Sequence, residues 1–210
     1  MQKIVLLGAG GHAHSCIDVI EQCKKYSIAG LIGKKEQMMS EVLGYPLLGT
    51  DEELKKISKK IKNAIISVGQ IKTPKLRINL YKKAIEAGFE LPIVQSPYAY
   101  VSPLAKIGEG TIIMHGAIVN ANAVIGKNCI LNTKCIIEHD AVVDDHCHVS
   151  TGAILNGKVF LGRGSFVGSG SVIKEKVNIG NYCVISANTF LNKSLTTGTI
   201  YKKWKLEIKI

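Results

Sequence analysis

The stretch LNTKCIIEHDAVVDDHCHV, residues 131–149, decides the fold of most of this chain. Its aliphatic residues Leu131, Ile137, Val143 and Val149 stand six positions apart, and a small residue precedes each of the last three by two positions. The same spacing runs outward without a break from Val101 to Leu191. An unbroken period of six predicts a parallel β-helix built from hexapeptide repeats.

Each hexad is expected to supply one short strand and one corner, and three hexads make one triangular coil. Two inward positions two residues apart agree with the alternation of side chains along a strand. Cys135 and Ile137 should therefore point inward and Ile136 outward, with His139 and Asp140 at the corner. Backbone with positive φ is expected at corner residues rich in glycine and asparagine, namely Gly108, Gly126, Asn132, Gly162, Gly168 and Gly180.

Residues 1–95 alternate strand-like and helix-like segments instead. Strands are predicted over 4–7, 28–32, 64–68 and 91–94, and helices over 12–25, about 51–62 and 74–87. Glu53 follows Thr50 by three positions and predicts a capping box at the start of the second helix. This alternation is typical of a small Rossmann-like parallel sheet. The predicted division is an α/β domain over 1–95, a left-handed β-helix over 96–196 and a basic tail over 197–210.

Composition limits the classes of function. The net charge of +11 favours acidic partners, such as nucleic acid, a membrane surface or a phosphorylated small molecule. Few aromatic residues and the absence of a basic helix argue against nucleic acid. The opening apolar run is too short to insert in a membrane. Free cysteines in the small inward register, and no C-x-x-C pair, predict buried thiols in a reducing cytoplasm.

The segment from Gly8 to His14, GAGGHAH, directly follows a strand and opens a helix. Backbone N–H groups at such a junction bind phosphate. A dinucleotide fold also needs an acidic residue after the second strand, where this chain has Gly33 and Lys34. The nucleotide of a substrate is therefore a better prediction than a redox cofactor, and a tight turn without a ligand is the alternative.

Histidines beside acidic residues are the other candidates for chemistry. In Glu138-His139-Asp140 a carboxylate next to an imidazole suits a general base, although a surface histidine without a role has the same appearance. His146 and His148 lie among acidic residues, but a corner should turn their rings apart, which disfavours a metal site. His115 has no acidic neighbour in sequence and is interpreted as a surface residue. Four lysines of the tail, Lys202, Lys203, Lys205 and Lys209, either cover the end of the prism or contact phosphate.

With these motifs, nearly the whole chain resembles a family of bacterial sugar acyltransferases. That family includes the bacillosamine N-acetyltransferase and the sialic acid O-acetyltransferase. The resemblance rests on the opening Gly-Ala-Gly-Gly-His-Ala, the α/β unit, the hexapeptide helix, and the run from Ile137 to Val143 continued by His148-Val-Ser-Thr-Gly-Ala. It implies a homotrimer with active sites in the clefts between prisms, acetyl-CoA as co-substrate, and no metal. This chain differs from the UDP-binding members of that family, which have aspartates where this chain has Gly33 and Lys34.

The resemblance also implies roles for individual residues. His139 would be the general base and Asp140 would orient it. His148 and the Gly157 N–H would contact the cofactor near its thioester, and Ser169 and Ala187 the pantetheine arm. A nucleotide-sugar would be held by the residues after the first two strands, namely Gly10, Gly11, His12, Gly33 and Lys34. The α/β domain would thus bind the nucleotide-sugar and the β-helix acetyl-CoA.

The expected reaction is acetyl transfer to the amino group of a nucleotide-linked amino sugar, a 4-amino-deoxy sugar in particular. A positioned base contributes about 10²–10⁴-fold to such a reaction, and a donor at the developing oxyanion about 3–4 kcal/mol. One alternative is a sugar O-acetyltransferase of the sialic acid type. Another is a β-helix without catalysis, or a metal enzyme using His115, His139 and His148.

Overall fold

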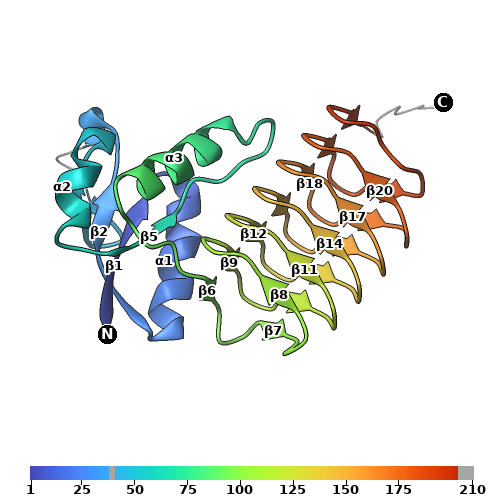
Figure 1. The fold of residues 1–210 in the computed structure, drawn as a ribbon, viewed down its shortest axis with the longest axis horizontal. Helices are drawn as coiled ribbons and strands as arrows, with labels where there is room; N and C mark the ends of the chain where they lie inside the picture. Colours follow the sequence, from blue (N-terminus) through green and yellow to red (C-terminus); the bar gives the residue numbers. More distant parts are fainter. Residues whose placement is uncertain (38–40, 203–210) are drawn as a thin grey trace, which may run out of the picture.

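The computed structural model describes residues 1–37 and 41–202, which form an α/β unit followed by a triangular prism (Figure 1). The tail lysines Lys203, Lys205 and Lys209 lie outside the described residues. The predicted fold class, an α/β domain followed by a left-handed parallel β-helix, is confirmed.

The α/β unit is a five-stranded sheet covered on both sides. Strand order is β3-β4-β2-β1-β5, and β3 alone runs antiparallel to its neighbour. The strands are β1 (Gln2–Leu7), β2 (Tyr26–Ile32), β3 (Glu41–Val42), β4 (Tyr45–Gly49) and β5 (Asn63–Ile66). The helices are α1 (Gly11–Cys23), η1 (Lys35–Gln37), η2 (Asp51–Glu53), α2 (Leu54–Ser58) and α3 (Lys75–Glu86). Along β1, Ile4 and Leu6 pack with α1 while Val5 and Leu7 pack with α2 and α3, as alternation requires.

The structure of this unit differs from the sequence predictions in two places. The hairpin of β3 and β4 was not predicted, because β3 is only two residues long and Pro46 interrupts the β pattern of β4. The strand predicted over 91–94 is instead a single bridge from Glu90 to Asn63, and Val94 already pairs with the prism. The capping box is confirmed, since the Thr50 N–H donates to Glu53 Oε2 at 3.0 Å.

The prism has three faces of short parallel strands, which we call A, B and C. Face A contains β6 (Val94–Gln95), β9 (Ile112–Ile113), β12 (Ile130–Leu131), β15 (His148–Val149), β18 (Phe166–Val167), β21 (Val184–Ile185) and β23 (Ile200–Tyr201). Face B contains β7 (Tyr100–Val101), β10 (Ile118–Val119), β13 (Ile136–Ile137), β16 (Ile154–Leu155), β19 (Val172–Ile173) and β22 (Phe190–Leu191). Face C contains β8 (Lys106–Ile107), β11 (Val124–Ile125), β14 (Val142–Val143), β17 (Phe160–Leu161) and β20 (Asn178–Ile179).

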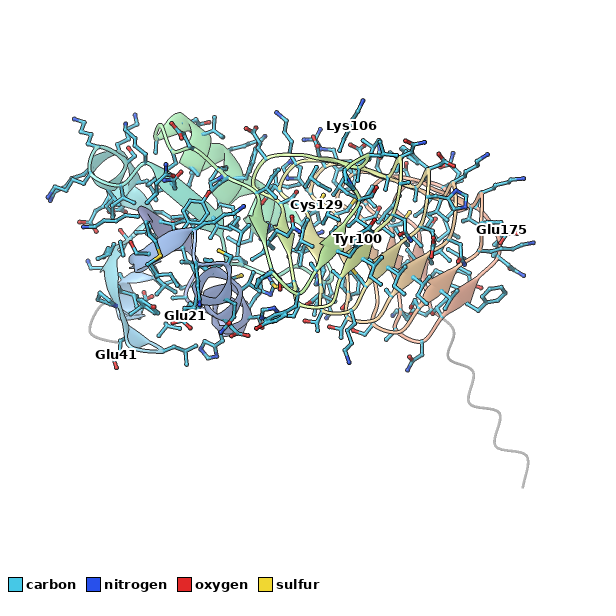
Figure 2. All side chains as sticks on the ribbon, turned by 90° about the horizontal axis from the view of Figure 1, so that it is seen from below. Glu21, Glu41, Tyr100, Lys106, Cys129 and Glu175 are labelled. Atoms are coloured by element: carbon cyan, nitrogen blue, oxygen red, sulfur yellow. The ribbon has the colours of Figure 1, made fainter. Side chains whose placement is uncertain are left out.

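Residues 18 apart are neighbours in adjacent coils, as the pairing of Ile118 with Ile136 shows. Inward columns of aliphatic and small residues fill the prism, and Cys129, which Figure 2 labels, is fully buried among them. The other inward cysteines, Cys135, Cys147 and Cys183, are also buried, as predicted. All six cysteines of the chain are free thiols.

The predicted role of the corner glycines is wrong in one respect. Gly126 and Gly162 do not have positive φ. They are needed because a Cβ at Gly126 would lie 2.6 Å from the Asp145 backbone nitrogen of the next coil. Positive φ occurs two positions later, at Asn128 and Gly164. Positive φ is also absent at Gly108, Asn132, Gly168 and Gly180 and again occurs two positions later in each case.

The α/β unit packs on face A. Ala13, Cys16 and Ile17 of α1 share one hydrophobic cluster with Ile112 and Ile130 of the prism. Hydrogen bonds reinforce this contact, because Gln70 Nε2 donates to the His146 carbonyl at 2.8 Å. Faces B and C, and the corner between them, therefore lie away from the α/β unit (Figure 1).

Within the described residues, no helix is both long and apolar enough to cross a membrane.

Candidate active site at the corner between faces B and C

His139 and Asp140 occupy the corner between β13 and β14. The equivalent corner one coil earlier is Ala121-Asn122, and one coil later it is Gly157-Lys158. Asp140 has a φ of 58°, as does Asn122, so both adopt the same left-handed turn. This turn projects the His139 side chain into solvent with 61% of it exposed, as expected for a reactive imidazole on a corner.

The His139 ring is held by Asp140. Nδ1 lies 2.9 Å from Asp140 Oδ2, and Asn122 Nδ2 donates to Asp140 Oδ1 at 3.4 Å. The bond from His139, and after it the bond from Asn122, keep the pKa of Asp140 below its ordinary value. An ionised Asp140 accepts the Nδ1 proton, which leaves the lone pair on Nε2 of neutral His139 free to take a proton.

Nε2 faces a cavity of about 430 Å³ on this edge of the prism. A Cβ added to Gly157 would lie 2.7 Å from Nε2, so the imidazole rests directly over that glycine. Among the described residues the Gly157 N–H has no acceptor. The walls add Glu138, which accepts from Asn120 at 2.9 Å, and the side chains of Lys158 and Lys176. A base and an unused N–H donor thus meet in one cavity, which is the arrangement that acyl transfer needs.

The residues predicted to hold a nucleotide-sugar come together at another place, the carboxyl edge of the α/β sheet. Leu7 pairs with Ile32, so Gly33 and Lys34 follow β2 beside the loop that follows β1. Gly10 is the N-cap of α1, whose first turn carries no acidic residue. A Cβ at Gly10 or Gly11 would have nothing within 4 Å, which leaves the helix N-terminus open to an anion.

His12 and His148 lie where this loop meets face A, with ring centroids 6.4 Å apart. Burial, with the nearby Arg77 charge, lowers the pKa of His12 to about 3, and burial lowers that of His148 to about 4. Both rings are therefore neutral at pH 7. His148 Nδ1 donates to the Gln70 carbonyl at 2.7 Å, and Asn132 Nδ2 lies 3.1 Å from Nε2. His12 Nε2 is buried without a hydrogen-bond partner among the described residues.

Ser169 and Ala187 stand at a third place, the exposed corners between faces A and B. Ser169 Oγ lies 2.9 Å from Ser150 Oγ of the coil before it. One chain therefore carries its predicted site residues in three groups: the nucleotide loop with His148, the A/B corner, and the B/C corner. The chain alone does not bring His139 to His148.

The interpretation of His115 as an isolated surface residue is wrong. His115 Nε2 contacts Asp18 Oδ2 of α1 at 2.9 Å, and Nδ1 contacts Ser96 Oγ at 2.6 Å. Ser96 is fully buried, so this Ser–His–Asp array joins the two units and does not expose a nucleophile. In the described part of the chain no three His, Cys, Asp or Glu residues gather as metal ligands, and His146 is buried with its Nδ1 beside Asn128 Nδ2.

Sequence reasoning also missed residues that support these sites. Asn122 and Lys158 could have been found by counting 18 residues from Asp140 in each direction, and Lys176 by counting a second 18 residues toward the C-terminus. Gln70 and Arg77 carry no such signal. Arg77 is fully buried and donates to the carbonyls of Ile66, Val68 and Asn128, which ties β5 and the loop after it to the prism.

The α/β unit and prism, with a corner histidine over a glycine, resemble the sugar acetyltransferases of the hexapeptide-repeat type. Residues 3–84 match the family of the PglD N-terminal domain. No curated protein matches the chain in sequence.

Solved structures extend this similarity over the whole chain. One is a mutant of perosamine N-acetyltransferase from Caulobacter crescentus in complex with CoA and GDP-perosamine, with TM-score 0.88, 28% identity and coverage of 94% of this chain and 91% of that one. Another is the acetyltransferase domain of PglB from Neisseria gonorrhoeae in complex with acetyl coenzyme A, with TM-score 0.86, 27% identity and 94% of each chain. WeeI from Acinetobacter baumannii shares the fold at 23% identity, with TM-score 0.82 over 94% and 95% of the two chains.

These findings confirm the resemblance predicted from the sequence. They agree with the predicted enzyme class, an acetyltransferase, and with acetyl-CoA as co-substrate, since the first two structures hold CoA and acetyl-CoA. They do not favour the sugar O-acetyltransferase alternative.

Proposed function

We propose that this protein transfers the acetyl group of acetyl-CoA to the amino group of a nucleotide-linked amino sugar, with His139 as general base. The observation that carries the proposal is the His139 imidazole, fixed by Asp140 and lying over Gly157 in the corner cavity. The similarity to N-acetyltransferases supports the choice of nitrogen over oxygen as the acceptor. A 4-amino-deoxy sugar is the proposed substrate class.

The residues divide the chemistry as follows. His139 Nε2 takes a proton from the attacking amine as its nitrogen bonds to the thioester carbonyl carbon. The Gly157 N–H donates to the carbonyl oxygen as negative charge develops there. Asp140 keeps the Nδ1 proton on the far side of the ring and stabilises the imidazolium that forms. The carbonyl then re-forms as the C–S bond breaks, and the departing thiolate takes the proton from His139, which restores the neutral imidazole.

The nucleotide of the sugar is assigned to the loop after β1. Gly10 and Gly11 leave the N-terminus of α1 open to phosphate, while Gly33 and Lys34 border the same edge. We assign Ser169 and Ala187 to the pantetheine arm, and His148 to the neighbourhood of the thioester, where Asn132 already holds its Nε2. The α/β unit would thus bind the sugar nucleotide and the prism acetyl-CoA.

A homotrimer would join the separated groups. Face B carries an outward column of apolar residues from coil to coil: Tyr100, Ile118, Ile136, Ile154, Val172 and Phe190. Tyr100, which Figure 2 labels, is 56% exposed in the single chain and Phe190 is 52% exposed, which favours a protein partner on this face. Packing of a second copy there would carry its B/C corner toward the A/B corner of the first. Free thiols are consistent with the cytoplasm, which stays a prediction.

The direct test is the His139→Ala variant, because Ala121 already occupies the same corner one coil earlier and shows that alanine fits the turn. Thiol release is measured with acetyl-CoA and a panel of nucleotide amino sugars and hydroxyl sugars. We expect turnover of amino sugars only, and a loss of at least about 10²-fold in kcat for His139→Ala.

Acetyl-CoA binding, measured by calorimetry, should be unchanged in this variant, and Lys106→Ala on face C is the control. Unchanged turnover in His139→Ala would remove the base assignment. Turnover of hydroxyl acceptors alone would overturn the proposed reaction.

A further inference from the structure

A cavity of about 470 Å³ lies where the N-terminal end of α3 meets the corner between faces C and A. It is bordered by Lys72, Lys75 and Lys82 on one side and by Tyr182 and Val184 of the prism on the other. The proposed catalytic corner is the edge between faces B and C, so this cavity is a separate place. Its volume is in the range of small-molecule sites.

The charge around this cavity is of one sign. Every lining side chain that is charged at neutral pH is a lysine. Among the described residues, none of the three lysines forms an ion pair, whereas Lys83 on the same helix contacts Asp51 at 2.9 Å. The first turn of α3 has no acidic residue, and its N-cap Pro74 has no side-chain acceptor, although the Lys75 N–H donates to Thr73 Oγ1 at 3.3 Å. Lysines and the helix dipole therefore both favour an anion.

The prism side of the cavity presents a planar ring. Tyr182 is 47% exposed, and a Cβ added to Gly164 would lie 2.7 Å from its ring carbons and 3.0 Å from Pro74 Cγ. Glycine at 164 thus lets the phenol ring lie close against the corner beside Pro74. Ile78 of α3 and Val184 of face A complete an apolar floor. A ring of this kind stacks with the base of a nucleotide.

We propose that this cavity binds a phosphorylated nucleoside, with phosphate against the lysines and the start of α3 and the base on Tyr182. The cavity spans both units, since α3 belongs to the α/β unit and Tyr182 to the prism. A bound nucleotide therefore bridges the units close to Gln70, which contacts His146 and His148. The proposal goes beyond the proposed acetyl transfer and does not depend on it.

The test is equilibrium dialysis of labelled ADP against the full chain. We expect Lys72→Glu/Lys82→Glu to weaken ADP binding at this site at least about tenfold. Tyr182→Asn should weaken it about tenfold through lost stacking. Asparagine is chosen because Asn128 adopts the same left-handed corner. The charge-matched control is Lys55→Glu/Lys59→Glu, at exposed lysines in and just after α2 that do not line the cavity, and it should change affinity less than about twofold.

An ADP site at the loop after β1 would survive these substitutions, so binding that none of them changes overturns the proposal. Inorganic phosphate that binds as tightly as ADP and ignores Tyr182→Asn also overturns it, because an anion site would then suffice. Repeating the ADP dialysis with saturating CoA distinguishes two possible ligands of this cavity, a free nucleotide and the nucleotide end of CoA. ADP that still binds beside CoA identifies a free nucleotide as the ligand. Displacement by CoA, with CoA affinity lowered by the lysine substitutions, identifies the nucleotide end of CoA; both results support the site.

Discussion

At the scale of the residue, the candidate active site differs from the equivalent corners of the neighbouring coils in its side chains and not in its backbone. Ala121, His139 and Gly157 occupy one column, and only the middle residue can accept a proton. The sequence was sufficient to predict His139 and Asp140 as partners, because adjacent residues at a corner need no tertiary information. It was not sufficient for His148, whose outward position on the prism is covered by the α/β unit.

Gly157→Ala tests the contact between His139 and its neighbour in the next coil. The φ of Gly157 is not positive, so alanine fits the backbone, but its Cβ would lie 2.7 Å from Nε2 and must displace the ring. We expect kcat to fall about 10²-fold with the fold intact. Steady-state kinetics measure the change in kcat, and thermal unfolding shows whether the fold is intact. Gly88→Ala, just after α3, is a control for stability alone, since nothing lies within 4 Å of the added Cβ and its φ of 87° strains alanine. Full activity in Gly157→Ala would contradict the assigned geometry.

At the scale of the element, two-residue strands have little stability of their own and depend on the columns inside the prism. The hexad rule predicted these inward positions because each is repeated from coil to coil. It could not predict β3 and β4, which occur once and pair only with each other and β2. It also placed the first prism strand late, because Val94 precedes the first periodic residue.

Leu161→Ala and Phe160→Ala separate inward from outward positions on one strand. Leu161 is fully buried and Phe160 is 37% exposed on face C. The inward truncation leaves a cavity between coils and should cost about 2–5 kcal/mol of the free energy of unfolding. The outward truncation should cost less than about 1 kcal/mol. Denaturant unfolding of both variants provides the measurement, and equal losses would contradict the packing described.

At the scale of the whole molecule, the position of the α/β unit on face A depends on groups that no local pattern marks. Arg77 donates to carbonyls of both units, and Asp18, Ser96 and His115 join them at another corner. These contacts arise from the docking of two separately predictable parts, so the sequence indicated each part but not their interface.

Three largely buried histidines at this interface predict a pH dependence of stability. Burial lowers the pKa of His12 to about 3 and that of His146 and His148 to about 4. In the unfolded chain they titrate near about 6.5. Between these limits the unfolded chain binds more protons, so the free energy of unfolding is greatest above pH 6.5 and falls as the pH is lowered toward 4.

Each such histidine contributes up to ~1.4 kcal/mol per pH unit in that window. His146→Asn, which suits the left-handed corner as Asn128 does, should reduce the slope by about one proton. Urea unfolding at several pH values between 7 and 4.5 measures the slope. An unchanged slope in the variant would show that His146 is not the titrating group.

Face B predicts the behaviour of the assembly. Ile136→Glu/Ile154→Glu places two charges in its apolar column and should yield monomers by sedimentation, with at least about a tenfold loss of turnover. Lys106→Glu on face C is the matched control and should stay associated and active. A double variant that sediments like the unaltered protein would exclude face B as the contact.

The corner that carries His139 recurs every 18 residues with the same backbone, at Asn122, Asp140 and Lys158. Three substitutions, Ala121→His, Asn122→Asp and His139→Gly, would therefore build the same arrangement one coil earlier, because the glycine under the imidazole is part of it. Each such move would shift the general base along the prism by one coil spacing, about 4.8 Å. A designer could use these steps to match the base to sugar substrates of different length.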